Sequence, residues 1–220
     1  MRRVGLALLL LSGCQASPPP SPVPEDCRYF RLTPGGPRSE CAFTTAFTEK
    51  CLRITSRTGA LTVTSCYEGA YQLLEAAAGI GAGEPVRVTA GGGRATVIRP
   101  GHEAQEFDAP PGLIVTSAPD WTDALLICTW WQRGGAPRQE FAGLWIHPEK
   151  PAQRLTFSAE RIGDGEPQRL TLRLRGNSLY AVWIDSAGRM IKLVSLPAGT
   201  GSTVLVREGF EAVASSLRPE

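Results

Sequence analysis

Histidine is scarce in this sequence, and the short motifs that mark many enzymes are missing. Only His102 and His147 occur among 220 residues. Neither belongs to an H-E-x-x-H motif, which places two zinc ligands on one helix face, and no serine stands in the G-x-S-x-G motif of a nucleophile elbow. The sequence therefore predicts no catalytic residue, no metal site and no cofactor. An extracytoplasmic hydrolase is the alternative, in which one histidine would meet a carboxylate or Cys128 in a cleft.

A surplus of positive charge is also missing. The chain has 23 Lys and Arg against 21 Asp and Glu, and Arg2 and Arg3 lie in the first thirteen positions. Removing those two leaves 21 residues of each sign, so the remaining chain is formally neutral. A nucleic-acid-binding protein needs a basic surplus to displace counterions from phosphates. We therefore expect no nucleic-acid partner.

The apolar run at the start of the chain is too short to cross a bilayer. Val4 to Leu11 are eight uncharged apolar residues, whereas a membrane-spanning helix needs about 20. The run follows Arg2 and Arg3 and precedes the small residues Ser12 and Gly13. This order predicts a signal peptide over residues 1–13. The alternatives are a secretory peptide cut elsewhere and a cytosolic chain with an apolar start.

The segment Leu11-Ser12-Gly13-Cys14 resembles the lipobox of bacterial lipoproteins. The resemblance implies that the Cys14 thiol receives a diacylglyceryl group and that the chain is cut just before it. Acyl chains such as palmitate would then anchor the protein, each buried methylene contributing about 0.8 kcal/mol. Gln15 follows the cysteine where an Asp would signal retention, so the resemblance also implies an outer-membrane location facing the periplasm. No family is identified for the rest of the chain.

A proline-rich spacer follows the predicted lipid site. Five prolines lie between Gln15 and Asp26, separated only by small or polar residues. Twelve such residues cannot form a hydrophobic core, and in a polyproline conformation they reach about 35 Å. We therefore expect residues 14–26 to form a lipidated tether. Behind it we expect a cysteine-rich segment over 27–83 and a β domain over 84–220.

Cysteine usage agrees with an oxidising compartment. After Cys14, four cysteines fall within forty residues, and one stands apart in an apolar run. The four predict two disulfides, with three pairings left open. These candidates are Cys27, Cys41, Cys51 and Cys66. We expect Cys128, the fifth, to be a buried and unreactive thiol.

Short apolar or alternating runs separated by glycine and proline turns predict a mainly β fold. We expect an antiparallel meander, as a sandwich or a half-barrel, with a hairpin of 85–90 and 94–99 joined by three glycines. A strand is expected over 124–131, and Gly79 to Gly83 is expected to link the two parts of the chain. Helices are expected over 68–78 and 208–217. Further strands are expected at 112–117, 140–146, 153–161, 168–175, 178–185, 189–196 and 202–207.

One predicted strand shows which of its faces is buried. Leu170, Leu172 and Leu174 alternate with Arg169 and Arg173, so one side should face the core and the other water. The arginines could also bind an anion. Neighbouring runs are apolar on both faces, so the sheet is either covered on both sides or curled around an apolar cavity.

Tryptophans are the candidate contacts for a ligand or partner. Trp130 and Trp131 are adjacent, so in a strand they would point to opposite faces, and Trp183 lies in a run that is apolar on both faces. Packing in the core is the simpler role for all three. The sequence thus predicts an envelope lipoprotein that acts as a non-catalytic binding or interaction module. Its partner would be a lipid, a glycan or an envelope protein, in addition to the membrane that holds the anchor.

Overall fold

A computed structural model describes residues 29–32, 39–40, 43–47, 51–58, 60–68, 71–117, 121–132, 134–198 and 202–218. The predicted signal peptide, Cys14, the proline spacer, Cys27 and Cys41 lie outside these residues. In the described part of the chain, no helix has both the length and the apolar character needed to cross a membrane.

The structure is mainly β and antiparallel, as predicted, and the described strands form two sheets. The first sheet has seven strands in sequence order, and every neighbouring pair is antiparallel. Its strands are β3 (Phe43–Phe47), β4 (Leu52–Thr58), β5 (Leu61–Glu68), β6 (Gln72–Ile80), β7 (Val86–Gly91), β8 (Arg94–Ile98) and β9 (Gln105–Asp108).

The second sheet has nine strands in the order β10-β11-β12-β13-β14-β15-β16-β1-β2. All of its pairs are antiparallel except β10 with β11. Most of it is C-terminal, but the first two strands of the chain join its far end. Its strands are β1 (Tyr29–Leu32), β2 (Ser39–Glu40), β10 (Ile114–Thr116), β11 (Arg138–His147), β12 (Lys150–Ile162), β13 (Gln168–Leu174), β14 (Asn177–Ile184), β15 (Met190–Ser195) and β16 (Val204–Arg207).

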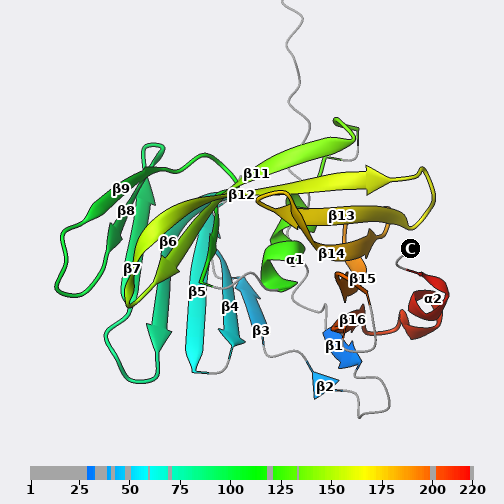
Figure 1. Cartoon of the computed structure of the whole chain (residues 1–220), viewed down its shortest axis with the longest axis horizontal. Coiled ribbons are helices and arrows are strands. Elements are labelled where there is room, and N and C mark those ends of the chain that lie inside the picture. Colours follow the sequence, from blue (N-terminus) through cyan, green and yellow to red (C-terminus); the bar gives the residue numbers. More distant parts are fainter. Residues whose placement is uncertain are drawn as a thin grey trace, which may run out of the picture.

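The two sheets face a shared interior that contains helix α1 (Trp121–Trp130). In Figure 1 the seven-stranded sheet lies on the left and the nine-stranded sheet curls from the top down the right side, with α1 between them. Side chains from both sheets and from α1 form one continuous hydrophobic cluster, which we call the inner core. The short C-terminal helix α2 (Glu211–Ser216) lies at the right, outside the nine-stranded sheet.

Two local predictions are wrong. The expected strand over 124–131 is helix α1, and the expected helix over 68–78 is mostly strand β6. An apolar run of this length has no period that separates a buried strand from a buried helix, and α1 is buried on nearly every side. In β6, Leu-Glu-Ala-Ala-Ala favours a helix, but pairing with β5 and β7 overrides that propensity.

The expected linker over 79–83 is also wrong. Gly79 and Ile80 end β6, and the following turn leads to β7, which pairs with β6 in the same sheet. Strands from both sides of residue 83 therefore share one sheet, and the glycines form a turn between neighbours.

Several local predictions are confirmed. The hairpin of β7 and β8 turns at Gly92 and Gly93, which both have positive φ, a conformation that glycine adopts without a Cβ clash. Strands β12 to β16 follow one another as an antiparallel meander, in which short turns at Gly176 and Gly188 join β13 to β14 and β14 to β15. The C-terminal helix forms over a shorter span than expected.

Candidate functional site

The predicted tether would attach to a strand that is built into the nine-stranded sheet. Tyr29 opens β1, is 2% exposed, and donates a hydrogen bond from its hydroxyl to the Met190 carbonyl at 3.0 Å. β1 also pairs along its whole length with β16. A load on the spacer would therefore reach the sheet directly, because β1 cannot peel away without breaking these bonds.

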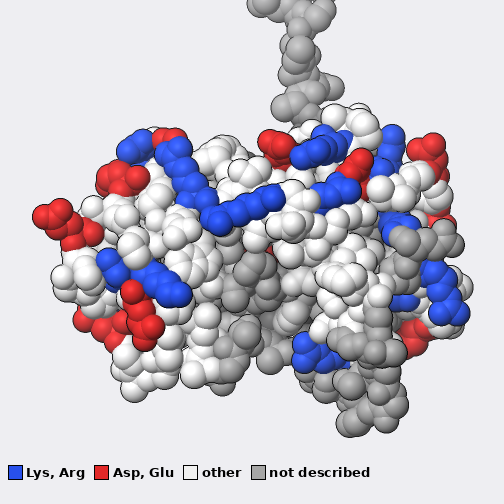
Figure 2. Space-filling model, viewed as in Figure 1, with Lys and Arg blue, Asp and Glu red and all other residues white. Residues whose placement is uncertain are grey.

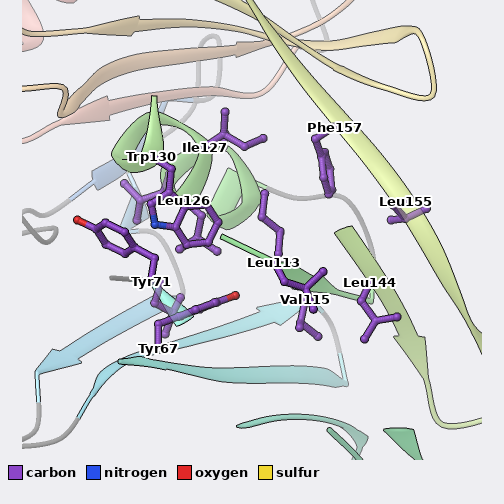
Figure 3. Close-up of a cluster of buried hydrophobic side chains, with 14 of the residues drawn as sticks. Tyr67, Tyr71, Leu113, Val115, Leu126, Ile127, Trp130, Leu144, Leu155 and Phe157 are labelled. Atoms are coloured by element: carbon purple, nitrogen blue, oxygen red, sulfur yellow. The ribbon is translucent and has the colours of Figure 1, made fainter. Parts of the chain in front are cut away.

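Trp130, one of the three candidate contacts, lies in the inner core. Its ring meets Tyr67 and Tyr71 edge to face, with ring centroids 5.5 Å apart in both pairs. Figure 3 shows this aromatic group beside Leu126 and Ile127 of α1, with Leu113 and Val115 nearby. Edge-to-face contacts of this kind stabilise a packed core. Trp130 thus packs between the sheets.

Trp131 also lies in the inner core, immediately after α1. Its indole N–H donates to the Gln168 side-chain oxygen at 3.0 Å, and the ring is 5% exposed. The two adjacent tryptophans do not point to opposite faces of a strand, because they stand at the end of a helix. Both therefore serve the packing of the interior.

Helix α1 occupies the space between the two sheets. Leu125, Leu126 and Ile127 are each at most 2% exposed. The β11–β12 wall is close-packed as well, since a Cβ at Gly143 would lie 2.7 Å from a Phe157 ring carbon. On the other side of the same sheet, consecutive residues at the end of β14 and along most of β15 are all buried, so these two strands are covered on both faces.

Trp183 differs from the other two tryptophans, because it lies on the outer face of the nine-stranded sheet. With Ala181 and Val194 it forms a second, separate hydrophobic cluster, which we call the outer cluster. Three partly buried residues pack against it: Leu196, Val204 and Leu217. Leu217 immediately follows α2, so the end of this short helix covers the cluster.

Two cations flank Trp183 across the strands. The register pairs Arg169 of β13 with Trp183 of β14, and Trp183 with Lys192 of β15. The Arg169 guanidinium carbon is 5.7 Å and the Lys192 ammonium 5.4 Å from the indole centroid. Both distances fall within the range of cation–π attraction. The outer face thus carries a row of cation, tryptophan and cation.

Lys192 also fastens α2 to the sheet. Its ammonium donates to the carbonyls of Ala214 at 2.7 Å and Leu217 at 2.6 Å, at the C-terminal end of the helix. Helix C-termini have unpaired carbonyls and a partial negative charge, which a cation stabilises. Burial, followed by the positive charge of Arg218, lowers the pKa of Lys192 below its ordinary value.

Positive and negative side chains are interspersed on the face shown in Figure 2, and several of them form ion pairs. Asp108 pairs with both Arg94 and Arg154, at 2.8 and 2.7 Å, and Glu160 pairs with Arg173. These pairs are exposed or partly exposed, so each contributes little to stability. They also neutralise much of the arginine charge near β12 and β13.

The cysteines divide into one disulfide and one free thiol among the described residues. Cys51 and Cys66 are bonded, which is one of the three pairings left open by the sequence. Cys128 is free and buried in α1, as expected for an unreactive thiol, although a strand was expected there. Burial raises the pKa of Cys128 far above its ordinary value, so the nucleophilic thiolate is disfavoured.

The two histidines do not join a catalytic group in the interactions that the structure describes. His147 stacks on Trp145 with centroids 5.6 Å apart, and its Nδ1 accepts the Glu149 backbone N–H. His102 lies in the turn after β8. Among the described residues, no group of three or more His, Cys, Asp or Glu could hold a metal ion. Cys128 is buried among α1 side chains, so it offers no nucleophile to a surface histidine.

The sequence does not reveal that Arg169 and Lys192 lie on either side of Trp183. The sequence predicts the meander and its turns but leaves the cross-strand register open. To predict the register one would have to know the bulges, which lie between Leu172 and Arg173 and between Trp183 and Ile184. Bulges shift the pairing by one residue and leave no clear sequence signal.

Comparison with known proteins gives no family for this chain. No family model and no curated protein match it. Among solved structures, a DUF1089 family protein from Pseudomonas aeruginosa is similar over 68% of this chain and 86% of its own, at 15% identity and a TM-score of 0.45.

Proposed function

We propose that this chain is a lipid-anchored lipoprotein of the bacterial cell envelope and acts there as a non-catalytic binding module. The anchor would be Cys14, and the proline spacer would hold the two-sheet fold away from the outer membrane, facing the periplasm. The lipobox and the order of the preceding residues support this location in the cell envelope.

The observation that carries the binding role is the row of Arg169, Trp183 and Lys192 on the outer face of the nine-stranded sheet. Trp183 is a large aromatic side chain between two cations, and the surrounding cluster is apolar. Trp183 and Lys192 are 3% and 9% exposed, so a partner would reach them when their cover opens. Aromatic and cationic residues at one place are typical of surfaces that bind amphiphilic partners or proteins. The partner would be a lipid, a glycan or an envelope protein.

Lipid attachment is tested by labelling cells with a palmitate analogue. The intact chain should incorporate the label and sediment with membranes, whereas Cys14→Ser should do neither. Ser17→Ala changes the spacer but keeps the lipobox, so it serves as the matched control and should be labelled normally. Equal labelling of Cys14→Ser would contradict the anchor.

The binding role is tested by native mass spectrometry on the secreted Cys14→Ser form, purified without detergent. Extra mass that disappears on denaturation would indicate a bound ligand and give its mass. If the bare chain appears, crosslinking in intact cells with a reagent that enters the periplasm, applied to the native lipoprotein, should capture an envelope protein. A bare chain that also captures nothing would contradict the binding role.

A further inference from the structure

Helix α2 covers the outer cluster with few contacts of its own. It has six residues, and Ala214 is its one buried residue. An isolated helix shorter than about 12 residues is marginal in water, so α2 depends on what holds it to the sheet. The described attachments are the Leu217 contact with the cluster, the two Lys192 hydrogen bonds at its C-terminal end, and Phe210 at its start, whose ring centroid lies 3.9 Å from the Arg207 guanidinium carbon and whose backbone N–H donates to the Arg207 carbonyl.

The surface beneath α2 has the composition of an amphiphile site. Removing the helix together with Leu217 would uncover part of the outer cluster, to which Trp183 belongs, and would take both carbonyl partners from the Lys192 ammonium. Arg169 stands on the other side of the indole. Two cations beside an indole and aliphatic side chains match an anionic headgroup that carries acyl chains.

The position of the tether places this surface near the membrane. The predicted spacer ends at β1, and β1 pairs with β16, which pairs with β15, the strand of Lys192. In Figure 1, α2 lies on the same side of the molecule as β16 and β1. An anionic lipid in the bilayer or released from it would therefore meet the outer cluster within reach of the tether.

We propose that α2 is a removable strap over a binding surface for an anionic phospholipid. In the closed state Lys192 donates to the helix carbonyls. In the open state Lys192 and Arg169 contact the lipid headgroup, and Trp183 contacts its apolar part. This inference rests on the proposed binding role and names the ligand class for the same surface.

The test uses two glutamine substitutions on the same helix in the soluble Cys14→Ser chain. Ala214→Gln places a larger polar side chain under the strap, where Ala214 is 2% exposed, whereas Ser215→Gln places the same side chain on the exposed face. Leu217→Gln is a second strap variant, at a half-buried position that tolerates the change more easily. Amide exchange of residues 211–217 should accelerate in Ala214→Gln and Leu217→Gln and stay unchanged in Ser215→Gln.

Binding is measured by co-sedimentation with vesicles of phosphatidylglycerol mixed with phosphatidylcholine, and with vesicles of phosphatidylcholine alone. Both strap variants should bind the anionic vesicles about tenfold more tightly than Ser215→Gln, the gain expected if the open state rises from about a tenth of the molecules to nearly all. Adding Arg169→Met to Ala214→Gln should abolish most of the preference for anionic vesicles.

Two outcomes would overturn the proposal. If Ala214→Gln and Leu217→Gln bind no better than Ser215→Gln while their strap exchanges faster, the surface under α2 is not a lipid site. If they bind neutral and anionic vesicles equally, the assignment of an anionic headgroup is wrong. Either result would leave the binding role intact if a ligand or an envelope protein is still found with the unmodified helix.

Discussion

The inner core and the outer cluster contain similar residues, but their covers differ greatly in size. Trp130 ends the ten-residue helix α1 and Trp131 follows it, both between the two sheets, whereas the cluster of Trp183 is partly covered by Leu217, the residue after the six-residue helix α2. Opening the inner core would separate sheets and cost much of the folding free energy. Opening the outer cluster would release one short element. Local opening of this kind draws on the least stable parts of a fold.

The contrast between the inner core and the outer cluster would fail most clearly if shortening a side chain of α1 left the free energy of unfolding unchanged. Leu125 is 2% exposed in the inner core, so Leu125→Ala should lower the free energy of unfolding by about 2–5 kcal/mol through lost burial and the cavity left behind. Urea unfolding followed by far-ultraviolet circular dichroism measures this. A loss below about 1 kcal/mol would mean that the interior is loosely packed.

The Cys51–Cys66 disulfide crosslinks the residue just before β4 to β5 in the seven-stranded sheet. Removing it should have the next largest effect on stability. Cys51 and Cys66 are 15 residues apart, so replacing both by alanine should cost about 3 kcal/mol in unfolding free energy. Thermal unfolding without reductant measures the loss. Any further loss when reductant is added to this double variant would report the second predicted disulfide, of Cys27 and Cys41. Intact mass should show the mature chain four hydrogens lighter than its reduced form.

Raising the pH into the alkaline range should change the stability contributed by Cys128 in the inner core and by Lys192 beside the outer cluster in opposite directions. Burial raises the pKa of Cys128 above 9.0, so above about pH 9 the unfolded chain binds fewer protons at this thiol than the folded chain. Its contribution to stability is complete below about pH 8 and falls with rising pH by up to about 1.4 kcal/mol per unit. The pKa of Lys192 is lowered from 10.5, so stability at that group rises as pH climbs from the folded pKa toward 10.5.

Urea unfolding of three proteins between about pH 8 and pH 10 separates these slopes. Cys128→Ala should flatten the decline, and Lys192→Met should make it steeper than in the unmodified chain. Identical slopes in all three proteins would contradict the burial of both groups.

The smallest effect should come from the cover of the outer cluster. Leu217→Ala removes a half-buried contact, so it should lower the free energy of unfolding by about 1 kcal/mol or less. Amide exchange of α2 should nevertheless accelerate, because the helix opens without the sheets. If exchange of β14 and β15 accelerated equally, α2 would be part of the cooperative fold and the distinction between the two regions would fail.

Turn chemistry and alternation predicted much of the sheet structure. The β7–β8 hairpin depends on consecutive glycines, and the β13–β14–β15 part of the meander on short turns at Gly176 and Gly188, both of which are local features. The sequence predicts a strand where helix α1 forms and a helix where strand β6 forms. Both errors arise because local propensity does not reveal which strands pair on either side of a segment. The candidate tryptophans were identified, but only the fold separates Trp183 from Trp130 and Trp131.

The sequence by itself determined the mainly β class and predicts the export signal, the lipid site and the spacer, because each depends on residue type and order over a short stretch. Tertiary structure decided that residues on either side of position 83 share one sheet, that an apolar run becomes the central helix, and that Arg169, Trp183 and Lys192 form a row whose Lys192 end is bonded to α2. Those outcomes depend on pairing and burial between residues far apart in the chain. Such contacts gain their free energy only when the whole fold is assembled.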